Sequence, residues 1–140
     1  MPDPIVKDLR PDEAARLLQD DPNTLLIDVR SRMEYDYVGH PVGAIHVAWM
    51  EPPEWRVLPD FVDRVHRVLE TRAAARAEDT PILTLCRSGA RSRAAAQTLA
   101  QEGFTRVFNV AEGFEGDRDA DGHRSSVSGW RFRDLPWEQS

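Results

Sequence analysis

The feature that most constrains the fold of this chain is a set of short, almost continuous apolar runs. Three runs of this kind are TLLIDV (24–29), PILTLC (81–86) and TRVFNV (105–110). Such runs are expected for strands that are covered on both faces, as the strands of a parallel sheet are. A shorter candidate strand is AIHVA (44–48). The runs therefore predict a sheet whose central strands are buried and parallel.

Amphipathic segments separate the apolar runs. They predict helices over residues 11–20, 61–77 and 91–103. In the first segment, Ala14, Leu17 and Leu18 share one face at helical spacing. Because parallel neighbours need crossover helices, this order predicts an α/β domain with a mainly parallel sheet. From Ala111 onward the chain has no clear period, and we expect a tail that packs over the domain through its aromatic residues.

Length and charge restrict the class of protein. The chain has 140 residues, which is enough for one domain with a real core and too few for two ordinary domains. No run approaches the ~20 apolar residues of a membrane span, and the first residues lack the pattern of a secretory signal, so we expect a cytoplasmic protein. The net charge of -6 argues against nucleic acid or an anionic membrane as the main partner.

The only cysteine, Cys86, stands at a chemically useful place. A single cysteine excludes an intramolecular disulfide and any multi-cysteine metal site. Cys86 ends an apolar run, and residues 87–92 lead directly into a predicted helix. In an open parallel sheet, ligands bind beyond the carboxyl ends of the strands, where a helix N-terminus offers unpaired N–H groups to an anion. Three arginines and no acidic residue lie close by in the sequence, namely Arg87, Arg91 and Arg93.

Two interpretations of Cys86 remain open from the residues. A lone cysteine at the end of an apolar strand is often a small buried hydrophobe. The alternative is a reactive thiolate, which the helix N-terminus and the charges of Arg87 and Arg91 would favour. Gly89 permits backbone conformations that other residues avoid, and packing alone does not explain two arginines so near a thiol. The loop therefore favours the reactive thiolate.

The loop CRSGARS (86–92) resembles the active-site loop of the rhodanese family of sulfurtransferases. Three further segments resemble the family in the same order, namely IDVRSRMEYDYVGHPVGAIHVA (27–48), VFNVAEGFEGD (107–117) and GWRFRDLPW (129–137). The resemblance covers roughly residues 5–138, which we take as one domain. It implies a rhodanese-like single domain with a mainly parallel central sheet of about five strands, flanked by helices on both faces.

The resemblance also implies roles for individual residues. Cys86 would be the nucleophile and would carry sulfur as a persulfide, and the side chains of Arg87 and Arg91 would contact the charge of the substrate. An anion cradle would be formed by the loop amides, namely those of Arg87, Ser88, Gly89, Ala90, Arg91 and Ser92. We expect Asp28 and Arg30 to be scaffold residues. No step of this chemistry requires a metal or an organic cofactor.

The implied function is transfer of a sulfane sulfur from a small anionic donor, such as thiosulfate, to a thiol or a cyanide-like acceptor. One alternative is a non-catalytic module that binds a partner protein, and loss of the cysteine would be its simplest sign. Another is a Cys-dependent phosphatase or arsenate reductase. Those enzymes have a Cys-x5-Arg pattern, in which an arginine stands at the sixth position after the cysteine. In this chain Ser92 stands at that position, and Arg91 falls one position early.

For other polar and aromatic side chains near these segments, the sequence indicates a role less clearly. Trp130 and Trp137 either line the mouth of a pocket or anchor the tail, and anchoring is the more common use of such aromatics. His40 and His46 have no partners at metal-ligand spacing, so we expect both to be non-catalytic.

Overall fold

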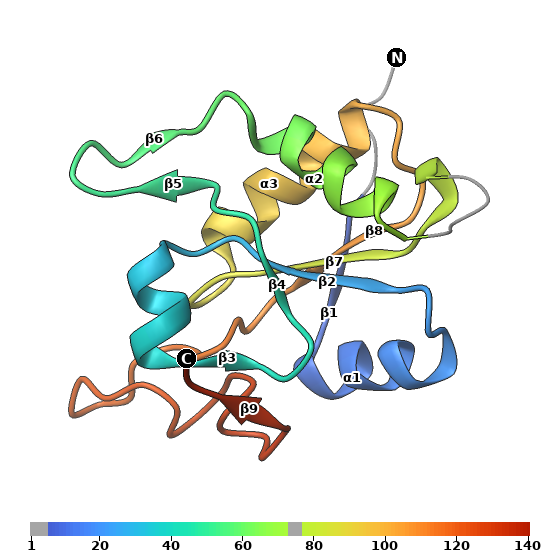
Figure 1. Cartoon of the computed structure of the whole chain (residues 1–140). Helices are drawn as coiled ribbons and strands as arrows, with labels where there is room; N and C mark the ends of the chain where they lie inside the picture. The colour runs from blue at the N-terminus through green and yellow to red at the C-terminus, as the bar shows by residue number, and fades with distance from the viewer. Residues whose placement is uncertain (1–5, 73–76) are drawn as a thin grey trace.

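A computed structural model describes residues 6–72 and 77–140 and places the apolar runs in one sheet (Figure 1). The sheet has five strands in the order β1-β8-β7-β2-β4, and every neighbouring pair is parallel. The strands are β1 (Lys7–Leu9), β2 (Leu25–Asp28), β4 (Ile45–His46), β7 (Ile82–Leu85) and β8 (Val107–Val110). The central pair, β2 and β7, is buried along its whole length. The parallel sheet predicted from the apolar runs is confirmed.

Helices cover both faces of the sheet, as expected. On one face lies α1 (Pro11–Asp20), and on the other lie α2 (Phe61–Glu70) and α3 (Ala90–Gln101) (Figure 1). Side chains point alternately to the two faces of a strand. Leu25 and Ile27 of β2 consequently pack with α2 and α3, whereas Leu26 packs with α1.

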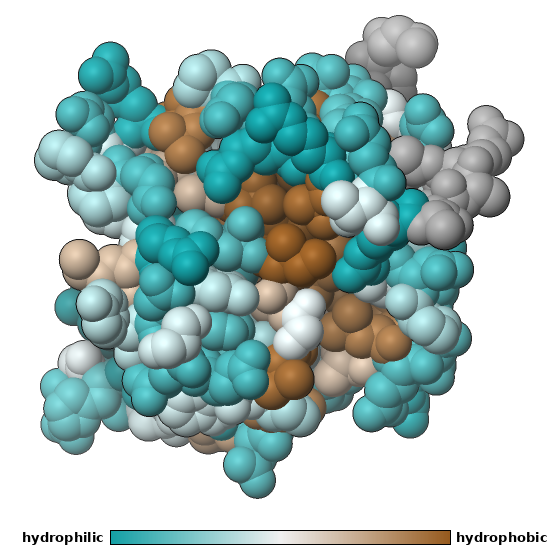
Figure 2. Space-filling model, viewed as in Figure 1, coloured by the Kyte–Doolittle hydropathy of each residue, from teal (hydrophilic) through white to brown (hydrophobic). Residues whose placement is uncertain are grey.

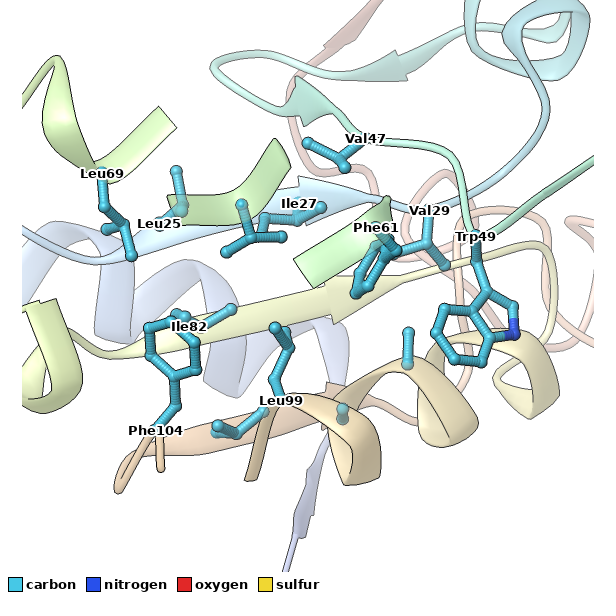
Figure 3. Close-up of a cluster of buried hydrophobic side chains, with 14 of the residues drawn as sticks. Leu25, Ile27, Val29, Val47, Trp49, Phe61, Leu69, Ile82, Leu99 and Phe104 are labelled. Carbon is cyan, nitrogen blue, oxygen red and sulfur yellow. The ribbon is translucent and has the colours of Figure 1, made fainter. Parts of the chain in front are cut away.

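The larger of the two cores lies between the sheet and helices α2 and α3. Figure 3 shows its side chains converging from β2, β7 and both helices. Trp49 and Phe61 meet edge to face, with their ring centroids 5.0 Å apart. Burial of such apolar surface stabilises a fold by about 25 cal/mol per Å². This core fixes β7 and α3 relative to each other, and the loop between them contains Cys86.

The end of one helix and the presence of one edge strand differ from the sequence-based expectation. The helix predicted over 61–77 ends at Glu70, where the hydroxyl of Thr71 donates to the carbonyl of Val68 at 2.7 Å. Residues 77–79 form a separate 3-10 turn, η2 (Ala77–Asp79), and residues 73–76 lie outside the described part of the chain. Strand β1 was not predicted, because its residues are only partly covered and show no apolar run.

The remaining elements are short and belong to the loops. A π-helical segment, η1 (Glu34–Val38), follows β2, and β5 (Met50–Glu51) and β6 (Arg56–Val57) form a hairpin. Strand β9 (Trp137–Glu138) closes the tail by pairing antiparallel with β3 (His40–Pro41). The tail is held by two buried aromatics, Phe114 and Trp130, which join the core on the α1 side. Anchoring of the tail is confirmed for these two residues, whereas Trp137 is 42% exposed.

The surface is largely polar. Figure 2 shows a mostly hydrophilic face on which apolar residues gather near the centre, beside edge strand β4. Within residues 6–72 and 77–140, no helix has the length and apolar character needed to span a bilayer.

Candidate active site

Cys86 lies at the carboxyl end of the central strand β7, immediately before the loop that leads into α3. Only 1% of its surface is exposed. The N–H of Gly89 points at the thiol, with the nitrogen 3.1 Å from Sγ, and the hydroxyl oxygen of Ser92 lies 3.2 Å from Sγ. Two hydrogen-bonding groups therefore surround a sulfur that is otherwise enclosed by protein.

The backbone of this loop is shaped by glycine and by the tail. Gly89 has a φ of +111°, and a Cβ at this position would lie 2.2 Å from the carbonyl oxygen of Ala111. The loop carbonyls turn away from the thiol, because Cys86 O accepts from the N–H of Phe114 at 2.8 Å and Arg87 O accepts from that of Glu115 at 3.0 Å. The 111–116 turn thus holds the outer side of the loop.

Most amides of the loop are left without protein acceptors. In residues 6–72 and 77–140, no acceptor meets the N–H groups of Arg87, Ser88, Ala90, Arg91 and Ser92. The last three belong to the first turn of α3, whose N–H groups have no partner inside the helix. Free amides at a helix N-terminus favour a bound anion. Their role as an anion cradle stays a prediction, and this geometry is compatible with it.

The two arginines of the loop differ in their surroundings. The guanidinium of Arg91 donates to both carboxylate oxygens of Glu34, at 2.8 and 2.9 Å. Burial alone would raise the pKa of Glu34, but the hydrogen bonds and charge of Arg91, with the hydrogen bonds from Ser31, lower it to about 2. Arg87, by contrast, is exposed and has no carboxylate partner among the described residues. The charge of Arg87 is therefore free to meet a substrate, whereas that of Arg91 is shared with Glu34.

A buried asparagine supports the groups that touch the thiol. Asn109 of β8 is 2% exposed, and its Oδ1 accepts from the Ser92 hydroxyl at 2.5 Å. Its Nδ2 donates to the carbonyl of Gly89 and to Asp8, each at 3.2 Å. Asn109 was not singled out from the sequence. Its signal was an amide inside an otherwise apolar strand, where asparagine is uncommon.

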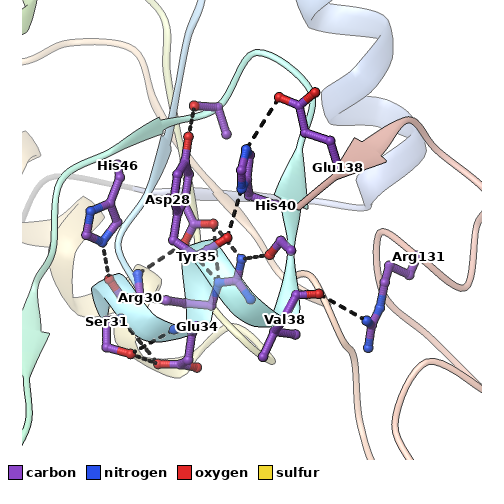
Figure 4. A network of polar contacts seen from close by, with 12 residues as sticks. Asp28, Arg30, Ser31, Glu34, Tyr35, Val38, His40, His46, Arg131 and Glu138 are labelled. Atoms are coloured by element: carbon purple, nitrogen blue, oxygen red, sulfur yellow. Dashed lines mark hydrogen bonds and ion pairs between the residues drawn. The ribbon is translucent and has the colours of Figure 1, made fainter. Parts of the chain in front are cut away.

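Asp28 and Arg30 form a buried pair beside the site (Figure 4). Nε of Arg30 lies 2.9 Å from Oδ1 of Asp28, and Nη2 lies 2.6 Å from Oδ2. Arg30 also donates to the carbonyl of Gly39, and its guanidinium stacks over the Phe114 ring at 4.6 Å. These contacts tie the end of β2 to η1 and to the tail, as a scaffold role requires.

The two nearby histidines are held by backbone carbonyls (Figure 4). Nδ1 of His40 lies 2.8 Å from the carbonyl oxygen of Tyr35, and Nε2 of His46 lies 2.7 Å from that of Arg30. His40 also stacks on the Tyr35 ring at 3.7 Å. His40 of β3 is thus held between η1 and Glu138, and His46 of β4 is held against the end of β2.

A cavity of about 840 Å³ lies over the loop. Its walls come from η1 and the segment before it, from the β5–β6 hairpin, from the loop and from the tail. The lining residues include Met33, Glu34, Tyr37, Trp55, Arg87, Arg91, Glu115 and Arg124. The tryptophan at the cavity is Trp55, while Trp130 is buried. Neither Trp55 nor Arg124 was identified from the sequence.

Comparison with known proteins shows the family of the chain. The sequence profile of the rhodanese-like domain matches residues 10–120. An uncharacterised protein of Rickettsia conorii is 30% identical over 128 residues, covering 90% of this chain and 92% of that protein. The thiosulfate sulfurtransferase GlpE of Haemophilus influenzae is 29% identical over 110 residues, covering 79% of this chain and 86% of that enzyme.

A solved structure is also similar over nearly the whole chain. The crystal structure of Rv0390 from M. tuberculosis superposes with a TM-score of 0.81 at 35% identity, covering 96% of this chain and 98% of that one. The family profile matches most of the chain, and the parallel sheet is consistent with that match. The chain therefore belongs to the family of rhodanese-like domains.

Proposed function

We propose that this protein is a sulfurtransferase that moves a sulfane sulfur from an anionic, thiosulfate-like donor to a thiophilic acceptor through a persulfide on Cys86. The observation that carries the proposal is the enclosure of Sγ by the Gly89 N–H and the Ser92 hydroxyl, at 3.1 and 3.2 Å. The Gly89 N–H is a hydrogen-bond donor that stabilises a thiolate and, after transfer, the sulfur attached to it. The single proton of the Ser92 hydroxyl is shared between Sγ and Oδ1 of Asn109.

The first half of the cycle loads the cysteine. The Cys86 thiolate attacks the sulfane sulfur of thiosulfate, and a bond forms between Sγ and that sulfur. The sulfur–sulfur bond of thiosulfate breaks, and its electron pair leaves with sulfite. The free amides of residues 87, 88 and 90–92, together with the Arg87 side chain, would stabilise the negative charge on the departing group.

The second half of the cycle returns the free thiolate. A nucleophilic acceptor, cyanide in an assay or a thiolate in a cell, attacks the outer sulfur of the persulfide. The bond between Sγ and that sulfur breaks, and its electrons remain on Cys86 as the thiolate. The products are thiocyanate or a new persulfide. The two displacements balance without an external oxidant or reductant. Together they complete one turnover of a ping-pong cycle.

The curated relatives support this assignment. GlpE of Haemophilus influenzae, named a thiosulfate sulfurtransferase, is 29% identical to this chain. We propose the same class of activity here, with a cytoplasmic location. The pairing of Arg91 with Glu34 counts against a Cys-x5-Arg phosphatase, because the guanidinium would have to leave its carboxylate to bind a phosphate.

A thiosulfate-to-cyanide assay that follows thiocyanate tests the proposal. Wild-type protein is expected to turn over, and Cys86→Ser to lose turnover, because a hydroxyl fills the same volume but is no nucleophile at neutral pH. Thermal unfolding of the variant checks that the fold is kept. An aryl phosphate serves as the counter-substrate, and no hydrolysis is expected. A Ser variant with a tenth of the wild-type activity would disprove the role of Cys86.

A further inference from the structure

The cavity over the Cys86 loop carries more apolar surface than an inorganic donor can use. We infer that it binds organic sulfur compounds in which the transferable sulfur is attached to an apolar, ring-sized body and accompanied by an anionic group. This inference rests on the proposed sulfur transfer and specifies its substrate class. The volume of about 840 Å³ falls in the range of small-molecule sites, roughly 300–1,000 Å³. A thiosulfate ion would leave most of it empty.

One wall of the cavity consists of large side chains that face solvent. Met33, Tyr37 and Trp55 line it and are 64%, 73% and 44% exposed. Met33 and Tyr37 come from the η1 region and Trp55 from the hairpin, and Figure 1 shows these two segments on the same side of the molecule. Single exposed apolar residues are common, but a group of them around one cavity marks a binding surface.

Trp55 is held in an unfavourable backbone conformation. Its φ is +53°, in the left-handed region that bulky residues avoid. Strain of this kind persists where the surrounding structure imposes it, often at ligand sites. Glycine would occupy the position without strain, so local folding does not explain the indole. What the indole supplies is a surface over the cavity, 6.0 Å from the guanidinium carbon of Arg91.

The walls of the cavity are joined to one another before any ligand arrives. The carboxylate of Glu51, in the hairpin, accepts from the backbone N–H of Arg32 at 2.9 and 3.1 Å. The pair of Glu34 and Arg91 then joins η1 to the start of α3. A chain of contacts therefore fixes the aromatic wall relative to the cysteine loop. A preformed site binds with a smaller loss of conformational entropy.

The charges of the cavity fit one negative group. Three arginines and two glutamates line it, so positive charge is in excess. Glu34 is paired with Arg91, and Glu115 lies 3.7 Å from Arg131. Arg87 and Arg124 have no carboxylate partner within the described ranges, and Arg124 is positioned by a 2.7 Å hydrogen bond to the carbonyl of Gly116. An organic thiosulfonate or persulfide, with an anionic end and an apolar body, matches this distribution.

The kinetic test compares two thiosulfonate donors that differ only in the organic group, which is methyl in one and phenyl in the other. Methanethiosulfonate and benzenethiosulfonate carry the same charge and the same transferable sulfur, and when Cys86 takes that sulfur the bond to it breaks and the sulfinate leaves with its electron pair. We expect Trp55→Gly to lower the ratio of their kcat/KM values, benzene over methane, at least fivefold. Val57→Ala is the matched control, since Val57 is exposed on the same hairpin and does not line the cavity. Trp55→Asn repeats the test with a second residue that tolerates positive φ.

A binding test separates this inference from the proposed function. Benzenesulfonate and methanesulfonate are unreactive analogues, and their affinities are measured by NMR titration. Wild-type protein should bind the ring compound about tenfold more tightly, which corresponds to about 1.4 kcal/mol, and Trp55→Gly should lose this preference. Equal affinities in wild type would overturn the inference, even if thiosulfate is turned over. A preference that depends on Trp55, in a protein that transfers no sulfur, would uphold the binding site and refute the proposed function.

Discussion

The pair of Glu34 and Arg91 makes a quantitative prediction about stability, because their side chains are only 19% and 21% exposed. The pKa of Glu34 falls from 4.5 to about 2 in the folded protein. At about 1.36 kcal/mol for each pH unit, this difference corresponds to about 3 kcal/mol of stability at neutral pH. Since the folded-state pKa lies below the unfolded value, the contribution is present above pH 4.5 and is lost as the pH falls towards 2.

Glu34→Gln removes the charge while keeping the shape of the side chain. Urea unfolding at about pH 7 should show that the free energy of unfolding falls by up to ~3 kcal/mol. The difference in the free energy of unfolding between wild type and variant should be smaller by roughly 1.4 kcal/mol at about pH 3.5, because Glu34 of the wild type is then partly protonated in the unfolding equilibrium and its pairing contributes less. Glu54→Gln, an exposed position on the hairpin, is the control and should leave both values unchanged. A gap of the same size at both pH values would refute the pairing.

Three further predictions concern the surroundings of the thiol. Arg87→Ala should lower kcat/KM for thiosulfate, with a loss of transition-state stabilisation of roughly 1–3 kcal/mol, the value of a charged hydrogen bond. The loss should be smaller for methanethiosulfonate, and equal losses for the two donors would indicate a scaffold role. Asp28→Asn should destabilise the fold by about 3 kcal/mol or more in urea, since it leaves a buried guanidinium without its counter-charge, while the folded fraction keeps sulfur transfer; a stable but inactive variant would contradict this. Asn109→Ala should slow sulfur loading about tenfold in stopped-flow experiments, an effect of about 1.4 kcal/mol. Thr84→Val, which removes a buried 2.9 Å bond to the Ser92 carbonyl, is its control and should change stability alone.

The parts of the fold that the sequence predicts are those with local patterns. The apolar runs ending at Asp28 and Cys86 mark buried strands because a central parallel strand needs apolar residues on both faces. The cysteine loop was located because a lone thiol, a glycine and two arginines fall between a strand and a helix. Each of these signals spans only a few residues, so it can be interpreted without knowing what lies nearby in space.

The features that escaped prediction depend on distant contacts. Glu34 and Arg91 are 57 positions apart, and nothing in either segment shows that they meet. Trp55 stands in a stretch without periodicity, and its place over the cavity follows from the path of the hairpin. The role of Asn109 depends on the parallel pairing of β7 and β8, which brings its side chain beneath the loop.

The central claim, a persulfide on Cys86, is tested most directly by mass spectrometry. Wild-type protein incubated with thiosulfate should gain about 32 Da, the mass of one sulfur atom, on the peptide that contains Cys86, and one sulfite should be released for each sulfur gained. Cyanide should remove the added mass and yield thiocyanate, and Cys86→Ser should show no gain. Turnover of thiosulfate without any added sulfur on Cys86, or a gain that persists in the Ser variant, would contradict the account.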